Sequence, residues 1–297
     1  MVSRHERVPQ MSVLRSRLDT GSEEHLANLE RMQAMWDEVA SELASVPTIG
    51  GQRYVDRHRT RGKLLVRERI EALVDPHTPF LELSPLAAWG TEDPVGAGVV
   101  TGIGIVAGTE VAITGSDITY RGGSVNPSTL AKSARFYEIA RQNRLPVVVL
   151  NESAGADLPR QADIFVPGGA QFKNLTQLSR AGIPTITIGF GPATAGGAYV
   201  PGMSDYVVMV KDRATAYLGG PPLVKMAIEE VVDEESLGGA EMHSRTSGLS
   251  DYLAVDELDA LRIGRDIVSH LRWTKQGPGP TEPDEADRKS TRLNYSQ

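Results

Sequence analysis

The sequence LPVVVLNESAGAD, residues 145–157, decides the fold of this chain. Its first part is an uninterrupted apolar run, which is typical of a β-strand covered on both faces. The run ends in small and polar residues from Asn151 onward. The same order returns at residues 185–199, where TITIGF leads into GPATAGGAY. Two buried strands, each followed by a loop of small residues, therefore stand at the centre of the chain.

Helical and extended patterns alternate around these two strands. The patterns predict helices over residues 128–143, 171–181, 221–230 and 256–273, a short helix from Gly196, and a further strand over residues 206–210. A helix between two strands of one sheet makes a crossover connection, so the sheet is expected to be largely parallel. The fold class that follows is α/β.

The region before residue 128 carries a hairpin and accessory helices. Residues 99–114 predict two strands around a turn at residues 107–110. Apolar residues at helical spacing predict helices over residues 22–45 and 64–74. The first helix fits two interpretations equally, an accessory helix that packs on a partner subunit and a plain surface helix.

Composition excludes several classes of site and of partner. The 297 residues include no cysteine, so thiolate nucleophiles, disulfides and cysteine-ligated metals are excluded. Lys and Arg number 31 against 38 for Asp and Glu, and this acidic balance disfavours nucleic acid as a partner. The histidines lack metal-binding spacing, so no metal site is expected. The lack of a spanning apolar run and of a signal peptide predicts a cytoplasmic protein outside the membrane.

The loops at residues 151–157 and 191–199 are the candidate sites of chemistry. Each joins a buried strand to a helix, an arrangement that points backbone N–H groups at an incoming anion. Small side chains there let a ligand approach the amides, as an oxyanion hole requires. Spacing alone favours the simpler interpretation, which is that both loops are tight strand-to-helix turns.

A side-chain catalyst is not evident. The chain has no GxSxG elbow and no P-loop, because the Gly-Lys step at residues 62–63 is followed by leucine. Candidate acid–base groups are Glu152, Asp157, Asp163 and Asp205. Such carboxylates more often cap helices or pair with arginines. The residues alone therefore lead to an α/β protein with two candidate anion-stabilising loops.

Four segments in order carry a resemblance to a known family. They are GKLLVRERIEALVDPHTPFLEL at residues 62–83, ESAGADLPRQ at 152–161, TAGGAYVPGMSD at 194–205 and GGPPLVK at 219–225. Together they resemble the carboxyltransferase (β) subunit of biotin-dependent acyl-CoA carboxylases, and within it the methylcrotonyl-CoA and related acyl-CoA carboxylase branch. The resemblance covers about residues 25–275. It reverses the preference on the two loops, which now predict oxyanion stabilisation.

The resemblance implies a ClpP/crotonase-like fold of repeated ββα units, in a single domain with N-terminal accessory helices. In such enzymes carboxybiotin, carried on a partner protein, gives its carboxyl group to an acyl-CoA thioester. The implied cofactor is biotin and the implied substrate an acyl-CoA. The implied partner is an α subunit with the biotin carboxylase and the biotin carrier, and the full-length protein is expected to form homo-oligomers.

Site residues follow by motif from the resemblance. Gly196 and Gly197 are predicted to stabilise one oxyanion, and Gly155 and Ala156 form a second pair near the ligand; which oxyanion each pair serves stays open. Substrate-binding candidates are Ala154, Ala195, Arg121 and Lys225. For the two cations, contact with CoA phosphates and plain surface solvation both stay open. The common family form of the first loop is DSGGA, whereas residues 152–156 read ESAGA here.

The resemblance also divides the chain. Residues 1–21 are expected to be a mobile arm, residues 22–275 the N-terminal carboxyltransferase domain, and residues 276–297 a linker remnant whose tail from residue 287 is unlike the family. The chain is then expected to be an incomplete acyl-CoA-binding half, inactive alone. Two alternatives stay open: a biotin-dependent acyl-CoA decarboxylase subunit, and a non-catalytic assembly module that docks through the helix at residues 22–45.

Overall fold

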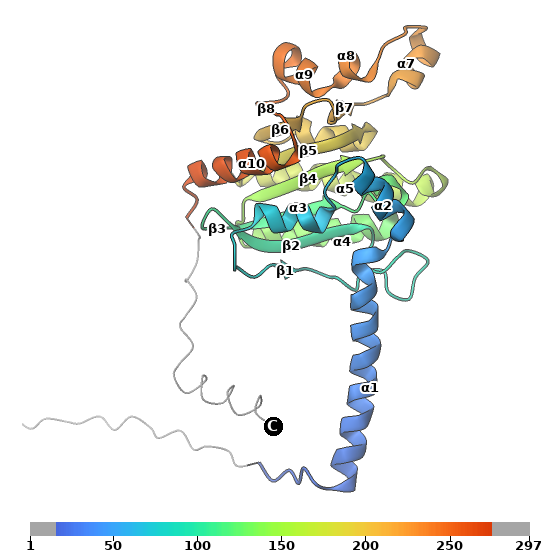
Figure 1. Cartoon of the computed structure of the whole chain (residues 1–297), viewed down its shortest axis with the longest axis vertical. Helices are drawn as coiled ribbons and strands as arrows, with labels where there is room; N and C mark the ends of the chain where they lie inside the picture. Colours follow the sequence, from blue (N-terminus) through green and yellow to red (C-terminus); the bar gives the residue numbers. More distant parts are fainter. Residues whose placement is uncertain (1–15, 275–297) are drawn as a thin grey trace, which may run out of the picture. The chain divides into compact units, whose positions relative to one another are not determined.

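The computed structural model describes residues 16–274 and divides the chain into two units (Figure 1). The first unit, residues 1–44, is built on helix α1 (Glu23–Ser45), which has no buried residue. Its large apolar side chains Leu26, Leu29 and Trp36 are exposed. The predicted helix is confirmed, and its role stays open. The predictions for residues 1–15 and 275–297 lie outside the described residues.

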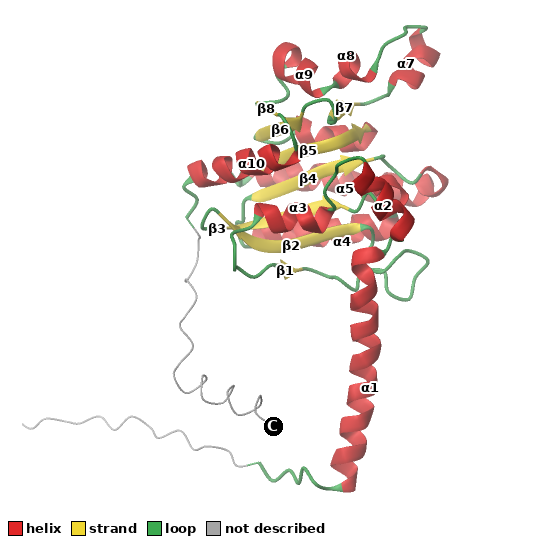
Figure 2. Ribbon diagram, viewed as in Figure 1, coloured by secondary structure: helices red, strands yellow, loops and turns green. Residues whose placement is uncertain are grey.

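The second unit is organised by one mixed sheet, drawn as yellow arrows in Figure 2. Within residues 16–274 the sheet has eight strands in the order β1-β2-β3-β4-β5-β6-β8, with β7 paired to β5. The strands are β1 (Leu81–Glu82), β2 (Val99–Val106), β3 (Thr109–Ser116), β4 (Val147–Ser153), β5 (Thr185–Thr194), β6 (Tyr206–Val210), β7 (Thr215–Tyr217) and β8 (Tyr252–Ala254). The first three pair antiparallel and the other pairs are parallel. The predicted hairpin and α/β class are thereby confirmed.

Helices cover both faces of this sheet. They are α2 (Gln52–Thr60), α3 (Val66–Leu73), α4 (Pro127–Gln142), α5 (Gln161–Arg180), α6 (Tyr199–Gly202), α7 (Pro221–Ile228), α8 (Glu234–Gly238), α9 (Ala240–Met242) and α10 (Glu257–Leu271). Single helical turns are η1 (Val46–Thr48), η2 (Arg121–Gly123), η3 (Leu158–Arg160), η4 (Ala195–Ala198) and η5 (His243–Ser247). Helices α3 and α10 pack on one face and α4 and α5 on the other (Figure 1).

Strand β4 shows how both faces are filled. Val148 and Leu150 belong to the apolar cluster with α3 and α10, whereas Val147 and Val149 belong to the cluster with α4 and α5. All four side chains are buried. The uninterrupted apolar run therefore serves two cores, because successive side chains of a strand point to opposite faces.

Capping residues set the starts of the main helices. Before α4, the side chain of Asn126 accepts a hydrogen bond from the Thr129 amide at 2.8 Å. Before α10, Asp256 accepts from the Asp259 amide at 2.8 Å. Each cap satisfies an amide that the first helical turn leaves without an acceptor, and contributes about 1 kcal/mol.

Several predicted bounds are wrong, and the errors share a cause. Helix α5 begins at Gln161 rather than at residue 171, although Pro167 lies within it. Strand β4 continues to Ser153 and β5 to Thr194, through residues that the sequence assigns to loops. Helices α2, α8 and α9 and the short strands β1, β7 and β8 are not predicted. In each case tertiary packing overrides local propensity.

Candidate functional site

A cavity of about 640 Å³ is lined by the sheet on one side and by α4 and α5 on the other. Both predicted loops reach it, through Gly155, Ala156, Ala195, Gly196 and Gly197. Among the described residues that line the cavity, none is Asp, Glu, Lys, Arg or His. The volume lies within the range of about 300–1,000 Å³ that small-molecule sites occupy. The chemistry of this cavity therefore depends on main-chain groups.

The two loops lie side by side because they end neighbouring parallel strands. Ser153, the last residue of β4, pairs with Ala193 of β5 across a register shift that follows Asn151. A Cβ atom placed on Gly155 would lie 3.6 Å from the carbonyl oxygen of Thr194, and one on Gly197 would lie 3.9 Å from Cβ of Ser153. The structure therefore brings the predicted loop residues together at one end of the sheet.

Hydrogen bonds of the first loop decide which amide faces a ligand. The Ala154 N–H donates to the Gly122 carbonyl at 3.0 Å, and the Gly155 N–H donates to Ser153 Oγ at 3.1 Å. Asp157 N–H donates across a bridge to the Val125 carbonyl at 2.9 Å. Among residues 16–274, the amide of Ala156 has no such acceptor. Of the predicted pair, Ala156 therefore has the available donor.

The second loop turns from strand to helix through a strained residue. Ala195 has a φ of +52°, in the left-handed region that L-residues other than glycine rarely adopt. Helix η4 begins at this residue, and in a 3₁₀-helix each N–H bonds the carbonyl three residues earlier. The amide of Gly196, the second residue, thus has no acceptor within the helix. Gly197 is the first residue whose amide has one.

The glycines of this second loop leave room that the protein itself does not fill. A Cβ atom on Gly196 would meet nothing nearer than the Phe172 ring at 3.6 Å, and Gly197 has a nearest neighbour at 3.9 Å. Neither residue has a positive φ. Packing and backbone conformation therefore do not demand glycine at these two positions. The space beside the amides is open to a ligand.

A second cavity, of about 320 Å³, lies against the first loop where the side chain of Ala154 points. In contrast with the large cavity it is charged and on balance basic, because Arg57, His58, Arg61 and Lys63 line it together with one carboxylate, Glu152, which pairs with Lys63. Burial lowers the pKa of His58 below its ordinary value, which favours the neutral ring. Ala154, predicted to bind substrate beside Gly155, thus faces the basic cavity and does not line the large one.

The two predicted cations lie at different distances from the loops. Arg121 precedes Gly122, which lines the basic cavity, and its guanidinium pairs with the Asp157 carboxylate at 2.7 Å. Its side chain is 57% exposed. Lys225 lies exposed on α7 and lines neither cavity. The structure therefore brings Arg121 near the site and leaves Lys225 without a described contact to it.

The candidate acid–base carboxylates have structural partners. Glu152 pairs with Arg69 and Lys63, and Asp157 pairs with Arg121. Asp205 accepts from the amide N–H and the hydroxyl of Thr185, and Asp163 lies exposed in the first turn of α5. No group of three potential metal ligands gathers within the described part of the chain. No helix of residues 16–274 is long and apolar enough to cross a membrane.

Comparison with known families decides what this architecture is. The family model described as the carboxyl transferase domain matches residues 57–296 of the chain. That match includes both loops, the whole lining of the large cavity, and the lining of the basic cavity except Tyr54. The chain belongs to the carboxyl transferase domain family. The resemblance seen in the sequence is thereby confirmed.

Related proteins of this carboxyl transferase domain are roughly twice as long. A probable biotin-dependent acyl-coenzyme A carboxylase beta2 subunit of Mycobacterium tuberculosis is 58% identical over 91% of the chain and 52% of its own length. The mitochondrial methylcrotonoyl-CoA carboxylase beta chain of Dictyostelium discoideum is 45% identical over 92% of the chain and 48% of its own. The chain spans about half the length of the curated relatives it matches.

Solved structures share the fold. The β subunit of Pseudomonas aeruginosa geranyl-CoA carboxylase matches with a TM-score of 0.76 and 38% identity, over 91% of this chain and 51% of that one. A transcarboxylase 12S structure matches with a TM-score of 0.74 and 30% identity, over 80% and 48%. The crotonase-like prediction is confirmed. Its ββα repeat is complete in β2, β3 and α4, and the next unit places a single long strand, β4, before its helix.

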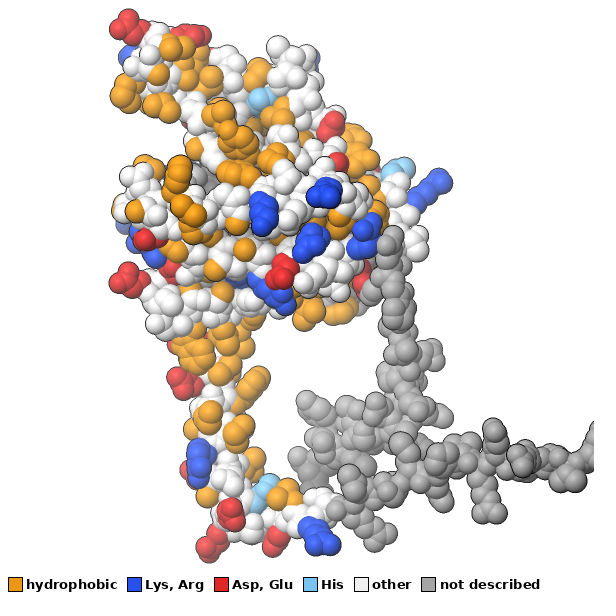
Figure 3. Space-filling view, turned by 180° about the vertical axis from the view of Figure 1, so that it is seen from behind, with side chains coloured by type: hydrophobic (Ala, Val, Ile, Leu, Met, Phe, Trp, Pro, Cys, Tyr) orange, Lys and Arg blue, Asp and Glu red, His pale blue; other side chains and the backbone are white. Residues whose placement is uncertain are grey.

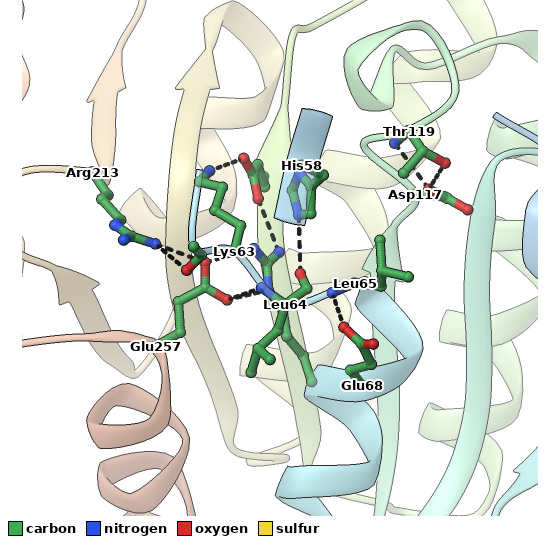
Figure 4. A network of polar contacts seen from close by, with 12 residues as sticks. His58, Lys63, Leu64, Leu65, Glu68, Asp117, Thr119, Arg213 and Glu257 are labelled. Atoms are coloured by element: carbon green, nitrogen blue, oxygen red, sulfur yellow. Dashed lines mark hydrogen bonds and ion pairs between the residues drawn. The ribbon is translucent and has the colours of Figure 1, made fainter. Parts of the chain in front are cut away.

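One feature of this carboxyl transferase domain escapes the sequence analysis: a buried ion network beneath the first loop (Figure 4). Arg69 of α3 bonds both Glu152 and Glu257, and Figure 4 shows Arg213 and Glu257 pointing toward each other. The sequence of α3 contains a signal for this network. In the α3 sequence VRERIEAL, Val66, Arg69 and Leu73 occupy the buried face. A charge at an apolar helical position predicts a buried partner.

Proposed function

We propose that this chain is the acyl-CoA-binding half of a carboxyltransferase that moves a carboxyl group from carboxybiotin to an acyl-CoA thioester. The observation that carries the proposal is the uncharged cavity of about 640 Å³ into which two loops of small residues converge. Family membership supports it, and so does the biotin-dependent carboxylase named among the relatives. Because the chain spans about half of those relatives, we expect it to bind substrate without completing the transfer.

The reaction needs stabilisation of negative charge rather than a nucleophile. When bound, carboxybiotin would release its carboxyl group as carbon dioxide, and the ring nitrogen so freed would take the proton that the acyl-CoA loses as it becomes a thioester enolate. The enolate carbon would then bond to the carbon dioxide. The amides of Ala156 and Gly196 are the donors that this chain offers to an oxyanion, with Gly155 and Gly197 shaping the same wall. One such donor contributes roughly 3 kcal/mol to the stabilisation of a transition state. Uncharged walls strengthen the contribution, because a low local dielectric strengthens each hydrogen bond.

The two loops also offer hydrogen-bond donors of the kind that biotin needs. An anionic urea oxygen needs the same kind of donor as an enolate, and the cavity offers two separate loops with small residues. The chain thus has room for donors to both oxyanions. We assign the thioester side to this chain and expect the residues that hold the biotin ring to lie in the other half of the relatives' length.

The basic cavity is the proposed location of the CoA phosphates. Arg57 and Arg61 line it, and Arg121 lies next to its lining residue Gly122. Clustered cations attract phosphate groups, and arginine binds them in a bidentate way. The two cavities share the loop at residues 152–156, so a ligand can reach both sides of it. Lys225 remains a weaker candidate for the same role.

Partners of the complete protein are also proposed. The solved transcarboxylase 12S is a hexamer assembly, and the biotin-dependent relatives imply a biotin-carrying α subunit. Helix α7 supports association, because Leu223, Met226 and Ile228 are exposed on it. Seen from behind, the part of the second unit that holds α7 gathers apolar side chains (Figure 3). The cytoplasmic location stays a prediction.

Calorimetric titration of the chain with an acyl-CoA tests the proposal. We expect saturable binding below millimolar concentration, and a Gly196→Val variant should weaken it at least tenfold by covering the amide. Gly202→Val is the matched control, because a Cβ there meets nothing within 4 Å and the residue does not line the cavity. Lack of binding by the unmodified chain, or equal effects of the two variants, would count decisively against the assignment.

A further inference from the structure

We infer that the buried network of Arg69, Glu152 and Glu257 holds the first oxyanion loop in place and contacts the strand that leads to the second, which makes Arg69 and Glu152 positioning residues. Neither residue lines the large cavity; Glu152 begins the first loop and lines the basic cavity, whereas Arg69 lines neither cavity. The inference rests on the proposed function for its catalytic meaning. Its structural content, a mechanical link between an ion network and a loop, can be tested separately.

Arg69 is the centre of the network and the largest fully buried side chain of the described residues. Its Nε and Nη2 donate to the two carboxylate oxygens of Glu257 at 2.9 and 3.0 Å. Its Nη1 donates to Glu152 Oε2 at 2.9 Å. One planar guanidinium thus joins α3, the start of α10 and the end of β4.

Arg69 also contacts the strand that leads to the second loop. Its guanidinium carbon lies 4.2 Å from the centroid of the Phe190 ring, on β5. The next residue, Gly191, lies against the Glu152 carboxylate, and a Cβ at that position would overlap it. The strand ends before both loops are therefore fixed against the same side chains.

The network and the cavity lie on opposite faces of the end of β4. Val148 and Leu150 pack with α3 and α10, although Leu150 also reaches the lining of the cavity, and Glu152 continues that side of the strand. Ser153 lies on the other side and lines the cavity. A shift of the Glu152 carboxylate consequently moves the backbone that presents the amides of residues 154–156.

Fold stability alone does not account for four buried or nearly buried charges at this place. Arg69, Glu152 and Glu257 are 1%, 3% and 5% exposed at the side chain, and Lys63 is 14% exposed. Desolvation of such groups offsets most of their attraction, and apolar replacements of similar size are often as stable. The neighbouring positions on this face are apolar, as Leu150 shows. An apolar replacement would lack the directional hydrogen bonds that fix the end of β4.

The experiment compares two variants of the full 297-residue chain that damage the same side of the sheet. Glu152→Gln leaves the cations of Arg69 and Lys63 facing an amide. Leu261→Ala is the matched control, since Leu261 is buried on α10 in the apolar cluster that also holds Leu150 and carries no charge. Thermal unfolding midpoints establish the loss of stability for each variant.

Two readouts then separate positioning from stability. Amide hydrogen exchange reports the loop directly, because the Ala154 and Gly155 amides donate hydrogen bonds there. We expect Glu152→Gln to accelerate exchange at these two amides at least tenfold and to weaken acyl-CoA binding at least tenfold. We expect Leu261→Ala to change the exchange rate and the acyl-CoA affinity by less than twofold. Each variant is measured 15 °C below its own unfolding midpoint, because single substitutions shift the midpoint by roughly a few degrees.

The outcomes are distinguishable. Equal exchange and equal affinity for the two variants overturn the inference. If the unmodified chain binds no acyl-CoA, the proposed function fails while the exchange measurement still decides whether the network holds the loop. Should Glu152→Gln not fold, Arg69→Lys replaces it, because one ammonium keeps the charge but cannot bridge Glu152 and Glu257 as the guanidinium does. That variant is expected to raise loop exchange three- to tenfold, and unchanged exchange would refute the link.

Discussion

The two loops that enclose the large cavity are held by different forces. The first, residues 152–156, is fixed by side chains, since Glu152 reaches the ion network and Ser153 Oγ bonds the loop's own backbone. The second, residues 191–197, is fixed by main chain, since β5 pairs with β7 and Ala195 turns the chain into η4. One wall of the cavity therefore depends on charge and the other on backbone conformation. Substitutions that remove charge and substitutions that change backbone freedom should separate them.

Removal of the Arg69 guanidinium is expected to have the largest effect, and it acts on the first loop. Arg69→Met leaves Glu152 and Glu257 without their shared partner in a buried setting. We expect the free energy of unfolding to fall by about 3–5 kcal/mol, because an uncompensated buried charge is costly. Urea denaturation measures this change.

The control for that experiment is Arg213→Gln. Arg213 pairs with Glu257 at 3.4 Å, and its side chain is 33% exposed. Solvent screens such a pair, so the expected loss is below about 1 kcal/mol. Similar losses for both variants would show that the buried arginine has no special part in holding the first loop.

A smaller effect is expected where the two loops touch. Gly191→Ala places a methyl group on the carboxylate of Glu152. Either the strand or the carboxylate must shift, and overpacking of this kind costs about 1–3 kcal/mol. Thermal unfolding of this variant is compared with that of Gly202→Ala, where the added methyl group meets nothing within 4 Å. A Gly191→Ala protein as stable as the control would mean that the two strand ends are not tightly coupled.

Much of the fold follows from the sequence, and its errors lie where the loops begin. The apolar run of β4 predicts a doubly covered strand, and both cores confirm it. The same pattern ends the strand at Leu150, whereas pairing with β5 extends it to Ser153. Polar residues such as Glu152 have low strand propensity, so local reasoning stops early. The partner strand and the buried arginine that keep them extended come from distant parts of the chain.

The site follows from the sequence only in outline. The motifs place Gly155, Ala156, Gly196 and Gly197 near a ligand, and the structure brings all four to one cavity. Which amides are free depends on acceptors such as Ser153 Oγ and on where η4 starts, and no local pattern gives either. The basic cavity was missed for the same reason, because α2 meets the first loop only through tertiary packing.

Removal of the Ser153 hydroxyl tests how side chains fix the first loop. Ser153 Oγ donates to the Gly123 carbonyl at 2.9 Å and accepts from the Gly155 amide at 3.1 Å. Ser153→Ala is expected to cost about 1–2 kcal/mol of unfolding free energy, because two buried groups lose their partner. Urea denaturation checks the stability. Amide exchange at Gly155 should quicken in parallel, and an unchanged rate would show that the hydroxyl does not order the loop.

The smallest expected effect bears on the second loop and has the opposite sign. Ala195→Gly should raise the free energy of unfolding by up to about 1 kcal/mol, because glycine adopts a φ of +52° without a Cβ clash. Ala154→Gly is the matched control in the first loop, where φ is not positive, and the added freedom of the unfolded chain should lower stability by a similar amount. Thermal unfolding of both variants gives the signs. Opposite signs mean that the surrounding backbone holds the second loop against a local preference of residue 195, as its main-chain anchoring requires. If both variants instead lost the same amount of unfolding free energy, the proposed difference between the two loops, one fixed by side chains and the other by main chain, would be wrong.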